Sequence, residues 1–224
     1  MRYTILIPCH NEAGSLRAVL ERLRADFPGD ECLVVDDGST DGTLDVAASV
    51  SGVRVHRLEP NRGKGVALRT GFSLAHGDAI LMIDGDGQDD PAEMRLLAAE
   101  IERGADFANG SKFIGTLVPG AISTPNYFGN RFMSGFINLL FRARVSDSQS
   151  GFRAVRAELI RTMNLRSVQY EIETEMLCQA IKRGARIVEV PVTRRPRSAG
   201  STGFRRVRNG LRILFTILAE RLRP

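Results

Sequence analysis

The chain has 224 residues, 43% of them hydrophobic, which is enough to fill the core of one sizeable α/β domain and excludes a disordered protein. Its formal net charge of +5 comes mainly from arginines that are concentrated toward the C-terminal end. The chain has three cysteines, an odd number without CxxC spacing, which disfavours a disulfide framework or a zinc site. We therefore expect the protein to reside in the reducing cytoplasm. We expect neither a signal peptide nor a membrane-spanning helix, since no apolar run approaches ~20 residues.

Short apolar runs alternate with segments of helical periodicity in the first half of the chain, which is typical of βαβ units around a mainly parallel sheet. The predicted strands cover residues 4–7, 32–35, 53–56 and 79–83. The predicted helices cover residues 12–23 and 66–75, and a third begins near Pro91. Residues 36–43, DDGSTDGT, predict a loop and a helix cap.

The second half of the chain is less regular. It predicts helices over residues 126–142 and 173–183, a turn entering a short strand over 147–154, and a strand over 187–192. Because we find neither an internal repeat nor a low-complexity linker, we expect a single domain over residues 1–203, followed by a helix over 204–224.

Polar clusters follow three of the predicted strands. They are PCHNE (residues 8–12), DDGSTD (36–41) and DGDGQDD (84–90). In open α/β sheets, ligands bind beyond the carboxyl ends of the strands. A helix cap would explain the middle cluster taken alone, but three clusters on one edge favour a binding site.

The DGDGQ segment predicts a metal site. Asp84 and Asp86 stand at alternate positions just past a buried strand, so their carboxylates can converge on one cation, with Gln88 as a further oxygen donor. Such oxygens suit Mg²⁺ or Mn²⁺, whose open positions phosphate oxygens fill. A helix cap explains Asp89 or Asp90 but not the two earlier carboxylates.

Two common phosphate-binding signatures are missing from the sequence. The first predicted strand is not followed by GxGxxG, and NRGKGV has valine where a Walker loop needs Ser or Thr. In NRGKG, Arg62 and Lys64 flank glycines ahead of a helix, so the segment is either a phosphate-binding loop or a solvated basic turn.

Seven motifs follow one another in the order IPCHNE, VVDDGSTDGT, NRGKGVALRTGF, DGDGQDDP, GSKF, DSQSGFRA and EVPV. In this order they resemble the family 2 inverting glycosyltransferases of GT-A fold, most of all the polyprenyl-phosphate branch with the dolichyl-phosphate mannose and glucose synthases. The resemblance covers residues 5–203. It implies an α/β fold with a Rossmann-like, mainly parallel sheet flanked by helices, and a C-terminal amphipathic helix.

The resemblance also implies roles for individual residues. Those expected to bind the donor nucleotide are Pro8, Glu12, Asp37, Lys64 and Asp84. The metal would be bound by Asp84, Asp86 and Gln88, with Asp86 closest to the diphosphate. Those expected near the acceptor phosphate are Arg131, Ser134, Arg153, Arg197 and Ser201; for each arginine the alternative is a surface cation.

The chain departs from the family pattern at three places. DGD replaces the frequent DAD and keeps both carboxylates, whereas Lys112 in GSKF replaces an arginine and loses its bidentate geometry. RSAGST lacks the usual terminal lysine of the basic glycine-serine loop, which bears on acceptor-phosphate binding.

The reaction that the resemblance implies is attack by a lipid-phosphate oxygen on the anomeric carbon of a nucleotide-activated hexose. The metal and Lys64 would stabilise the charge of the leaving diphosphate. A phosphate monoester has a second pKa of ~6, so this nucleophile is already anionic and needs no strong base. A sugar-hydroxyl acceptor would need one, and Asp89 is the candidate.

The C-terminal segment predicts an amphipathic helix with a basic flank. Its apolar positions are Phe204, Val207, Leu211, Leu214, Leu218 and Leu222, and its neighbouring cations are Arg205, Arg208 and Arg212. One interpretation places this helix on anionic headgroups at the cytoplasmic face of a membrane, as a peripheral anchor. The other packs it on the domain or on a second subunit.

Two further hypotheses compete with the leading one. A basic protein that binds RNA or membrane without catalysis is compatible with the charge, but only 6% of residues are aromatic and the acidic clusters stay unexplained, so we expect no nucleic-acid partner. The other competing hypothesis is a family 2 enzyme that transfers the hexose to a sugar hydroxyl instead of a lipid phosphate. NRGKGVALRTG resembles glucose-type synthases slightly more than mannose-type ones, which leaves both UDP-glucose-type donors and GDP-mannose open.

Overall fold

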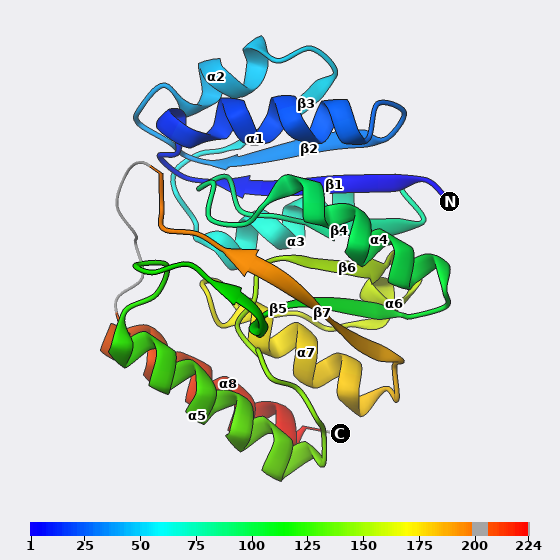
Figure 1. Ribbon diagram of the computed structural model, residues 1–224, viewed down its shortest axis with the longest axis vertical. Coiled ribbons are helices and arrows are strands. Elements are labelled where there is room, and N and C mark those ends of the chain that lie inside the picture. Colours follow the sequence, from blue (N-terminus) through cyan, green and yellow to red (C-terminus); the bar gives the residue numbers. More distant parts are fainter. Residues whose placement is uncertain (199–205, 224) are drawn as a thin grey trace.

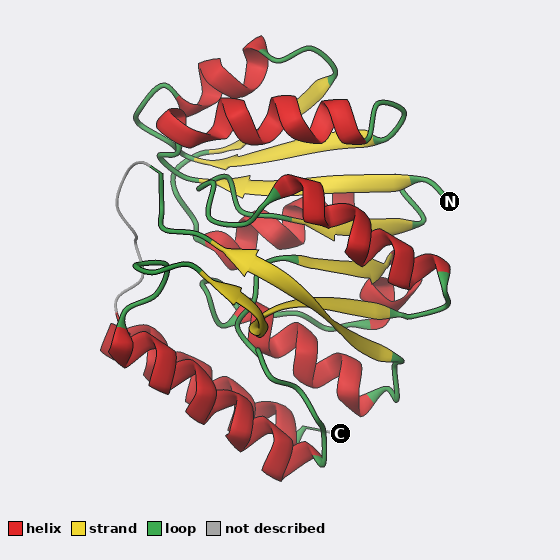
Figure 2. Ribbon diagram, in the orientation of Figure 1, coloured by secondary structure: helices red, strands yellow, loops and turns green. Residues whose placement is uncertain are grey.

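A seven-stranded sheet runs through the molecule, with helices packed on both faces (Figures 1 and 2). The computed structural model describes residues 1–198 and 206–223. Its strands are β1 (Tyr3–Cys9), β2 (Glu31–Asp37), β3 (Val53–Leu58), β4 (Ala79–Met82), β5 (Phe107–Leu117), β6 (Arg153–Arg156) and β7 (Ile187–Arg194).

The helices of the described residues begin and end close to the predicted positions where a prediction was made. They are α1 (Ala13–Asp26), α2 (Thr43–Ser49), α3 (Lys64–Leu74), η1 (Pro91–Glu93), α4 (Met94–Glu102), α5 (Thr124–Phe141), α6 (Ala157–Thr162), α7 (Ile172–Lys182) and α8 (Arg206–Leu222). The helix expected near Pro91 starts there as a 3₁₀ turn, and Asp90 caps it by accepting the backbone N–H of Ala92 at 3.1 Å.

The sheet is mainly parallel, as predicted. Its strand order is β3-β2-β1-β4-β6-β5-β7, and only β6 runs antiparallel to its neighbours. Strands β1, β2 and β4 therefore end at the same edge. This edge carries the polar clusters, so the topology gathers them in one place.

Each strand in the middle of the sheet contributes to two hydrophobic cores, because successive side chains point to opposite faces. In β1, Ile5 packs into the core that contains Leu16 of α1, while the adjacent Leu6 packs into the core that contains Leu68 of α3. Both faces are covered, which explains why β1, β2 and β4 are apolar almost throughout.

The structure corrects one local prediction and adds elements for which no prediction was made. Asp36 and Asp37 end strand β2 instead of opening a loop, because Asp36 pairs in register with Cys9 of β1. Helix α2 follows the predicted loop and helix cap and begins at Thr43, the last residue of that segment. Strand β5 has no counterpart in the predictions, because polar residues at Asn109, Ser111 and Lys112 interrupt its apolar pattern.

Helix α8 packs onto the domain. Its inner side chains Ile213 and Ile217 are fully or almost fully buried in the core that α7 shares, and Glu220 lies 4.0 Å from Lys182 of α7. Helix α5 lies alongside α8 (Figure 1). Phe204 and Arg205, predicted for the same helix, lie outside the described residues. Within residues 1–198 and 206–223, no helix combines the length and the hydropathy needed to cross a bilayer.

Candidate active site

Two cavities open side by side at the carboxyl edge of the sheet. The first has a volume of about 830 Å³ and is lined by residues from the ends of β1, β2 and β4 and from α3 and α8. The second has a volume of about 560 Å³ and extends from the end of β4 to β5, α5 and β7. The residues that line both cavities are Lys64, Asp84, Asp86, Tyr170 and Arg197.

All five residues predicted to bind the nucleotide line the first cavity: Pro8, Glu12, Asp37, Lys64 and Asp84. Asp37 also fixes the NRGKG segment, because its two carboxylate oxygens accept the backbone N–H groups of Arg62 and Gly63 at 2.8 and 2.7 Å. Gly63 has a φ of 99°, and a Cβ there would lie 2.2 Å from the carbonyl oxygen of Val168. The segment is therefore a constrained wall of the cavity rather than a solvated turn.

Lys64 forms the centre of a buried ion-pair group. Its Nζ lies 2.6 Å from Asp84 Oδ1 and 2.7 Å from Glu173 Oε1. Burial alone would lower the pKa of Lys64, but the two carboxylates together raise it above the usual range. Burial alone would raise the pKa of Asp84, but the neighbouring Lys64 outweighs this effect and lowers it. At Glu173 burial prevails and raises the pKa. Lys64 and Asp84 thus stay charged at neutral pH.

Arg197 bridges two of the predicted site residues. One terminal nitrogen lies 2.7 Å from both carboxylate oxygens of Glu12, and the other lies 3.2 Å from Asp86 Oδ2. Asp86 is 4% exposed. Burial is the largest influence on Glu12 and raises its pKa, although Arg197 opposes the shift. Arg197 therefore holds the polar clusters of β1 and β4 together.

Arg194 of β7 occupies the oxygens of Gln88 and Asp89. It donates to Gln88 Oε1 at 2.9 Å and to Asp89 Oδ2. The Gln88 amide nitrogen donates to the carbonyl oxygens of Ala121 and Arg195. Burial raises the pKa of Asp89, with Arg194 opposing it. Asp89, the predicted base, is thus an ion-pair partner rather than a free carboxylate.

The residues at the junction of the cavities fit a divalent metal that is shared with a diphosphate. Within the described part of the chain, His, Cys, Asp and Glu side chains form no group of three or more that could hold a metal ion by itself. Mg²⁺, however, is usually bound through one or two carboxylates together with substrate phosphates. Asp84 and Asp86 supply such a pair of carboxylates at the wall between the cavities.

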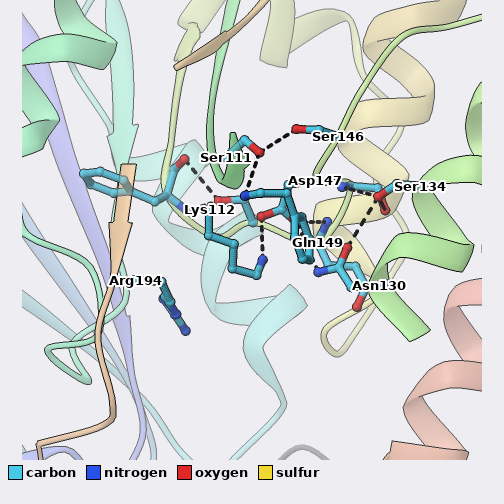
Figure 3. Close-up of polar contacts among 12 residues, drawn as sticks. Ser111, Lys112, Asn130, Ser134, Ser146, Asp147, Gln149 and Arg194 are labelled. Atoms are coloured by element: carbon cyan, nitrogen blue, oxygen red, sulfur yellow. Dashed lines mark hydrogen bonds and ion pairs between the residues drawn. The ribbon is translucent and has the colours of Figure 1, made fainter. Parts of the chain in front are cut away.

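A second polar network surrounds Asp147 in the second cavity (Figure 3). The Asp147 carboxylate pairs with Lys112, accepts the Asn130 amide N–H at 3.1 Å and accepts the Gln149 backbone N–H at 3.2 Å. Asn130, Asp147 and Gln149 were not predicted as site residues. Asp147 begins the DSQSGFRA motif, so the motif already pointed to it, whereas nothing in the sequence distinguished Asn130.

The residues predicted for the acceptor phosphate are dispersed. Of the four that the structure describes, only Arg197 lines either of these two cavities. Arg131 is exposed and stacks over the Phe113 ring at 5.7 Å. Ser134 is buried, where its hydroxyl accepts the backbone N–H of Ser148 at 3.0 Å. Ser201 lies outside the described residues.

Arg153 is one of the most buried side chains, with 1% exposure. It lies on β6, an inner strand of the sheet between β4 and β5. Its side chain is enclosed in the protein interior. It donates to Asn109 Oδ1 at 3.0 Å and to the carbonyl oxygens of Glu173 and Ser148 at 2.5 and 3.0 Å. Burial lowers its pKa to about 10. In this conformation Arg153 supports the loops of the second cavity from behind.

Comparison with known proteins places this site in a described family. The family model for glycosyl transferase family 2 matches residues 4–163. The chain is 34% identical over 208 residues to glycosyltransferase AglJ of Haloferax volcanii, covering 92% of this chain and 67% of the relative. It is also 34% identical over 218 residues to an undecaprenyl-phosphate mannosyltransferase of Micrococcus luteus, covering 90% and 87%.

A solved structure shares the fold. It is glucosyl-3-phosphoglycerate synthase from Mycobacterium tuberculosis in complex with Mn²⁺ and UDP-glucose, which is similar with a TM-score of 0.79 and 21% identity. The similarity covers 100% of this chain and 80% of that one. At this identity the likeness concerns the fold, which confirms the predicted GT-A architecture.

Proposed function

Since the chain belongs to glycosyl transferase family 2, we propose that it transfers a hexose from a nucleotide sugar to a polyprenyl phosphate. The observation that carries this proposal is the position of Asp84 and Asp86 at the wall shared by two cavities. The first cavity would hold the donor, with its base and ribose near Pro8 and Asp37, and the second would hold the acceptor phosphate. Family membership excludes a non-catalytic basic binding protein.

The charges at the junction suit this reaction. A Mg²⁺ or Mn²⁺ ion, when bound by Asp84 and Asp86, would supply Lewis-acid stabilisation of the leaving diphosphate. Lys64, which stays protonated, adds a fixed positive charge on the same side. Gln88 would complete the metal's oxygen donors once Arg194 releases it.

The state of Asp89 favours a phosphate acceptor over a sugar hydroxyl. Its Oδ2 already accepts a hydrogen bond from Arg194, so this oxygen is occupied by a protein donor rather than open to an acceptor hydroxyl. A phosphate monoester is mostly anionic at neutral pH and needs no base, whereas a hydroxyl acceptor does. The mannosyltransferase of Micrococcus luteus has, by its name, an undecaprenyl-phosphate acceptor.

The test is a transfer assay with defined acceptors. Purified protein is incubated with Mn²⁺ or Mg²⁺, a panel of UDP- and GDP-sugars and a polyprenyl phosphate, and the lipids are analysed by mass spectrometry. We expect a hexosyl-phospholipid that forms with one class of donor and disappears when EDTA removes the metal. A product found only on an oligosaccharide acceptor would contradict the proposal and favour the hydroxyl-acceptor alternative.

The outer faces of α5 and α8 provide a surface for the membrane that contains such an acceptor. Large apolar side chains are exposed on both helices: Phe128, Phe132, Leu139, Val207, Leu211, Phe215, Leu218 and Leu222. The two helices contain a single carboxylate, Glu220, and it is 1% exposed, while Arg131 and Arg221 are exposed. An apolar face with cations and no exposed carboxylate matches an anionic bilayer.

We therefore propose that the chain binds peripherally to an anionic membrane through α5 and α8. The second cavity is lined by residues of both helices, including Asn126 and Ile213, so the acceptor phosphate would enter from the lipid side. The cysteines Cys9, Cys32 and Cys178 are free thiols, which fits the expected cytoplasmic face.

A charge substitution on this surface is expected to weaken membrane binding strongly. Replacing Phe215, which is 65% exposed, by glutamate should reduce cosedimentation with phosphatidylserine-containing vesicles at least tenfold, because the buried apolar area is lost and a like charge is introduced. Leu96→Glu is the matched control, since Leu96 is 49% exposed and stands on α4, which lies apart from α5 and α8 (Figure 1). Equal binding of both variants would assign the apolar face to another partner.

A further inference from the structure

Helix α8 lies between the two cavities and contributes to both. Arg208, Asn209 and Arg212 line the first cavity, while Gly210 and Ile213 line the second. The two arginines follow the exposed Val207 and Leu211 by one position, which turns them by about 100° around the helix axis. They are thus directed to the flank that borders the first cavity and not to the outward apolar face.

The first cavity is rich in carboxylates, and these are already engaged. They are Glu12, Asp37, Asp41, Asp84 and Asp86. Asp37 and Asp41 accept backbone N–H groups, Asp84 pairs with Lys64, and Glu12 and Asp86 pair with Arg197. The lining cations Lys64 and Arg197 are therefore neutralised within the protein.

Arg208 and Arg212 differ from the other cations of this cavity. Neither guanidinium makes an ion pair or hydrogen bond with any residue in the ranges 1–198 and 206–223. Lys64 and Arg197 are held by carboxylates of the protein, whereas the guanidinium groups of Arg208 and Arg212 remain available to a ligand in the cavity. The planar, fixed donors of a guanidinium match the oxygens of a phosphate group.

We propose that Arg208 and Arg212 bind the diphosphate of the nucleotide-sugar donor. This inference rests on the proposed function, because it identifies the ligand of the first cavity as a nucleoside diphosphate. It also changes the role predicted for these residues from the sequence, which assigned them to anionic lipid headgroups. Helix α8 then has two separate functions on adjacent faces: its apolar face binds the membrane, and its arginines bind the donor.

The experiment measures nucleotide affinity and membrane binding on the same variants of the full chain. Titration calorimetry with UDP and with GDP, in the presence of Mn²⁺, is performed on the wild type and on the double variant Arg208→Gln, Arg212→Gln. We expect the variant to bind the preferred nucleotide tenfold to a hundredfold more weakly, which corresponds to about 1.4–2.8 kcal/mol, because two charged donors to the diphosphate are lost at the solvent-accessible side of the cavity. Binding to phosphatidylserine-containing vesicles should change less than about twofold in comparison.

Arg161→Gln is the matched control, because Arg161 is exposed in the last turn of α6 and lines neither cavity. It should bind nucleotide as the wild type does. A double Arg→Lys variant, which keeps the charge, should recover part of the affinity, and thermal melting of each variant verifies the fold. Unchanged nucleotide affinity in the glutamine variant would overturn the inference; a simultaneous loss of vesicle binding would then assign the arginines to headgroups. If the wild type binds neither UDP nor GDP, the proposed function itself fails.

Discussion

Replacing Asp86 by asparagine is expected to reduce the rate of sugar transfer about 100- to 1000-fold, the loss typical when one preorganised electrostatic contact to developing charge is removed. Asp86 is buried at the wall shared by the two cavities, where the diphosphate leaves the hexose in the proposed reaction. The amide keeps the shape of the side chain but removes its charge, so it holds a divalent metal poorly. The transfer assay, performed at saturating Mn²⁺, measures the rate.

Asp90→Asn is the matched control for this variant. Asp90 belongs to the same acidic loop, but its carboxylate caps η1 and pairs with Arg195 at 2.9 Å, and it lines neither cavity. We expect it to retain the wild-type rate within about twofold, since it touches no group of the reaction. A wild-type rate for Asp86→Asn would refute the metal assignment, whereas equal losses in both variants would indicate a general effect of charge on the loop.

The first half of the fold could be predicted because its signals are local. Strands β1, β2 and β4 are continuous apolar runs, and the helices between them repeat their apolar residues with helical periodicity. In parallel sheets the strand ends coincide, so the clusters after these strands had to meet. This explains why all five nucleotide predictions, from Pro8 to Asp84, line one cavity.

The second half required tertiary information that the sequence pattern lacks. Strand β5 pairs with β7 and β6 although Asn109 and Ser111 are polar, because those side chains find partners inside the protein. The same applies to Asp147, whose partners Lys112 and Asn130 are distant in sequence. Motif order suggested residues near the acceptor, but it did not distinguish a cavity wall from the layer behind it.

Helix α8 shows a related limit. Its periodicity gave the apolar face and the neighbouring arginines correctly, since Val207, Leu211 and Arg208 are exposed as the pattern indicates. Periodicity fixes the angles between side chains but not what lies beside each face. Only the packing of α8 on α7 showed that Arg208 and Arg212 border the first cavity.

Replacing Arg153 by methionine is expected to lower the free energy of unfolding by about 3–5 kcal/mol, the usual result of removing one partner from a buried charged network. The guanidinium stacks over Phe107 at 5.2 Å, and its hydrogen bonds satisfy Asn109 and two carbonyl oxygens. Methionine fills a similar volume but leaves these acceptors without a donor in a place that water does not reach. Urea unfolding, followed by circular dichroism, measures the loss.

Arg156→Met provides the comparison, because Arg156 stands on the same strand and also donates to carbonyl oxygens, those of Ala105 and Ile101. Its side chain is 30% exposed, so water can replace the lost donor and the expected cost is only about 1 kcal/mol. Both variants replace an arginine that donates to carbonyl oxygens by methionine, so the difference between their losses of stability measures the effect of burial. It also decides between the two roles considered for Arg153: a residue that binds the acceptor phosphate would, when replaced, raise the KM for polyprenyl phosphate while leaving stability equal to that of Arg156→Met.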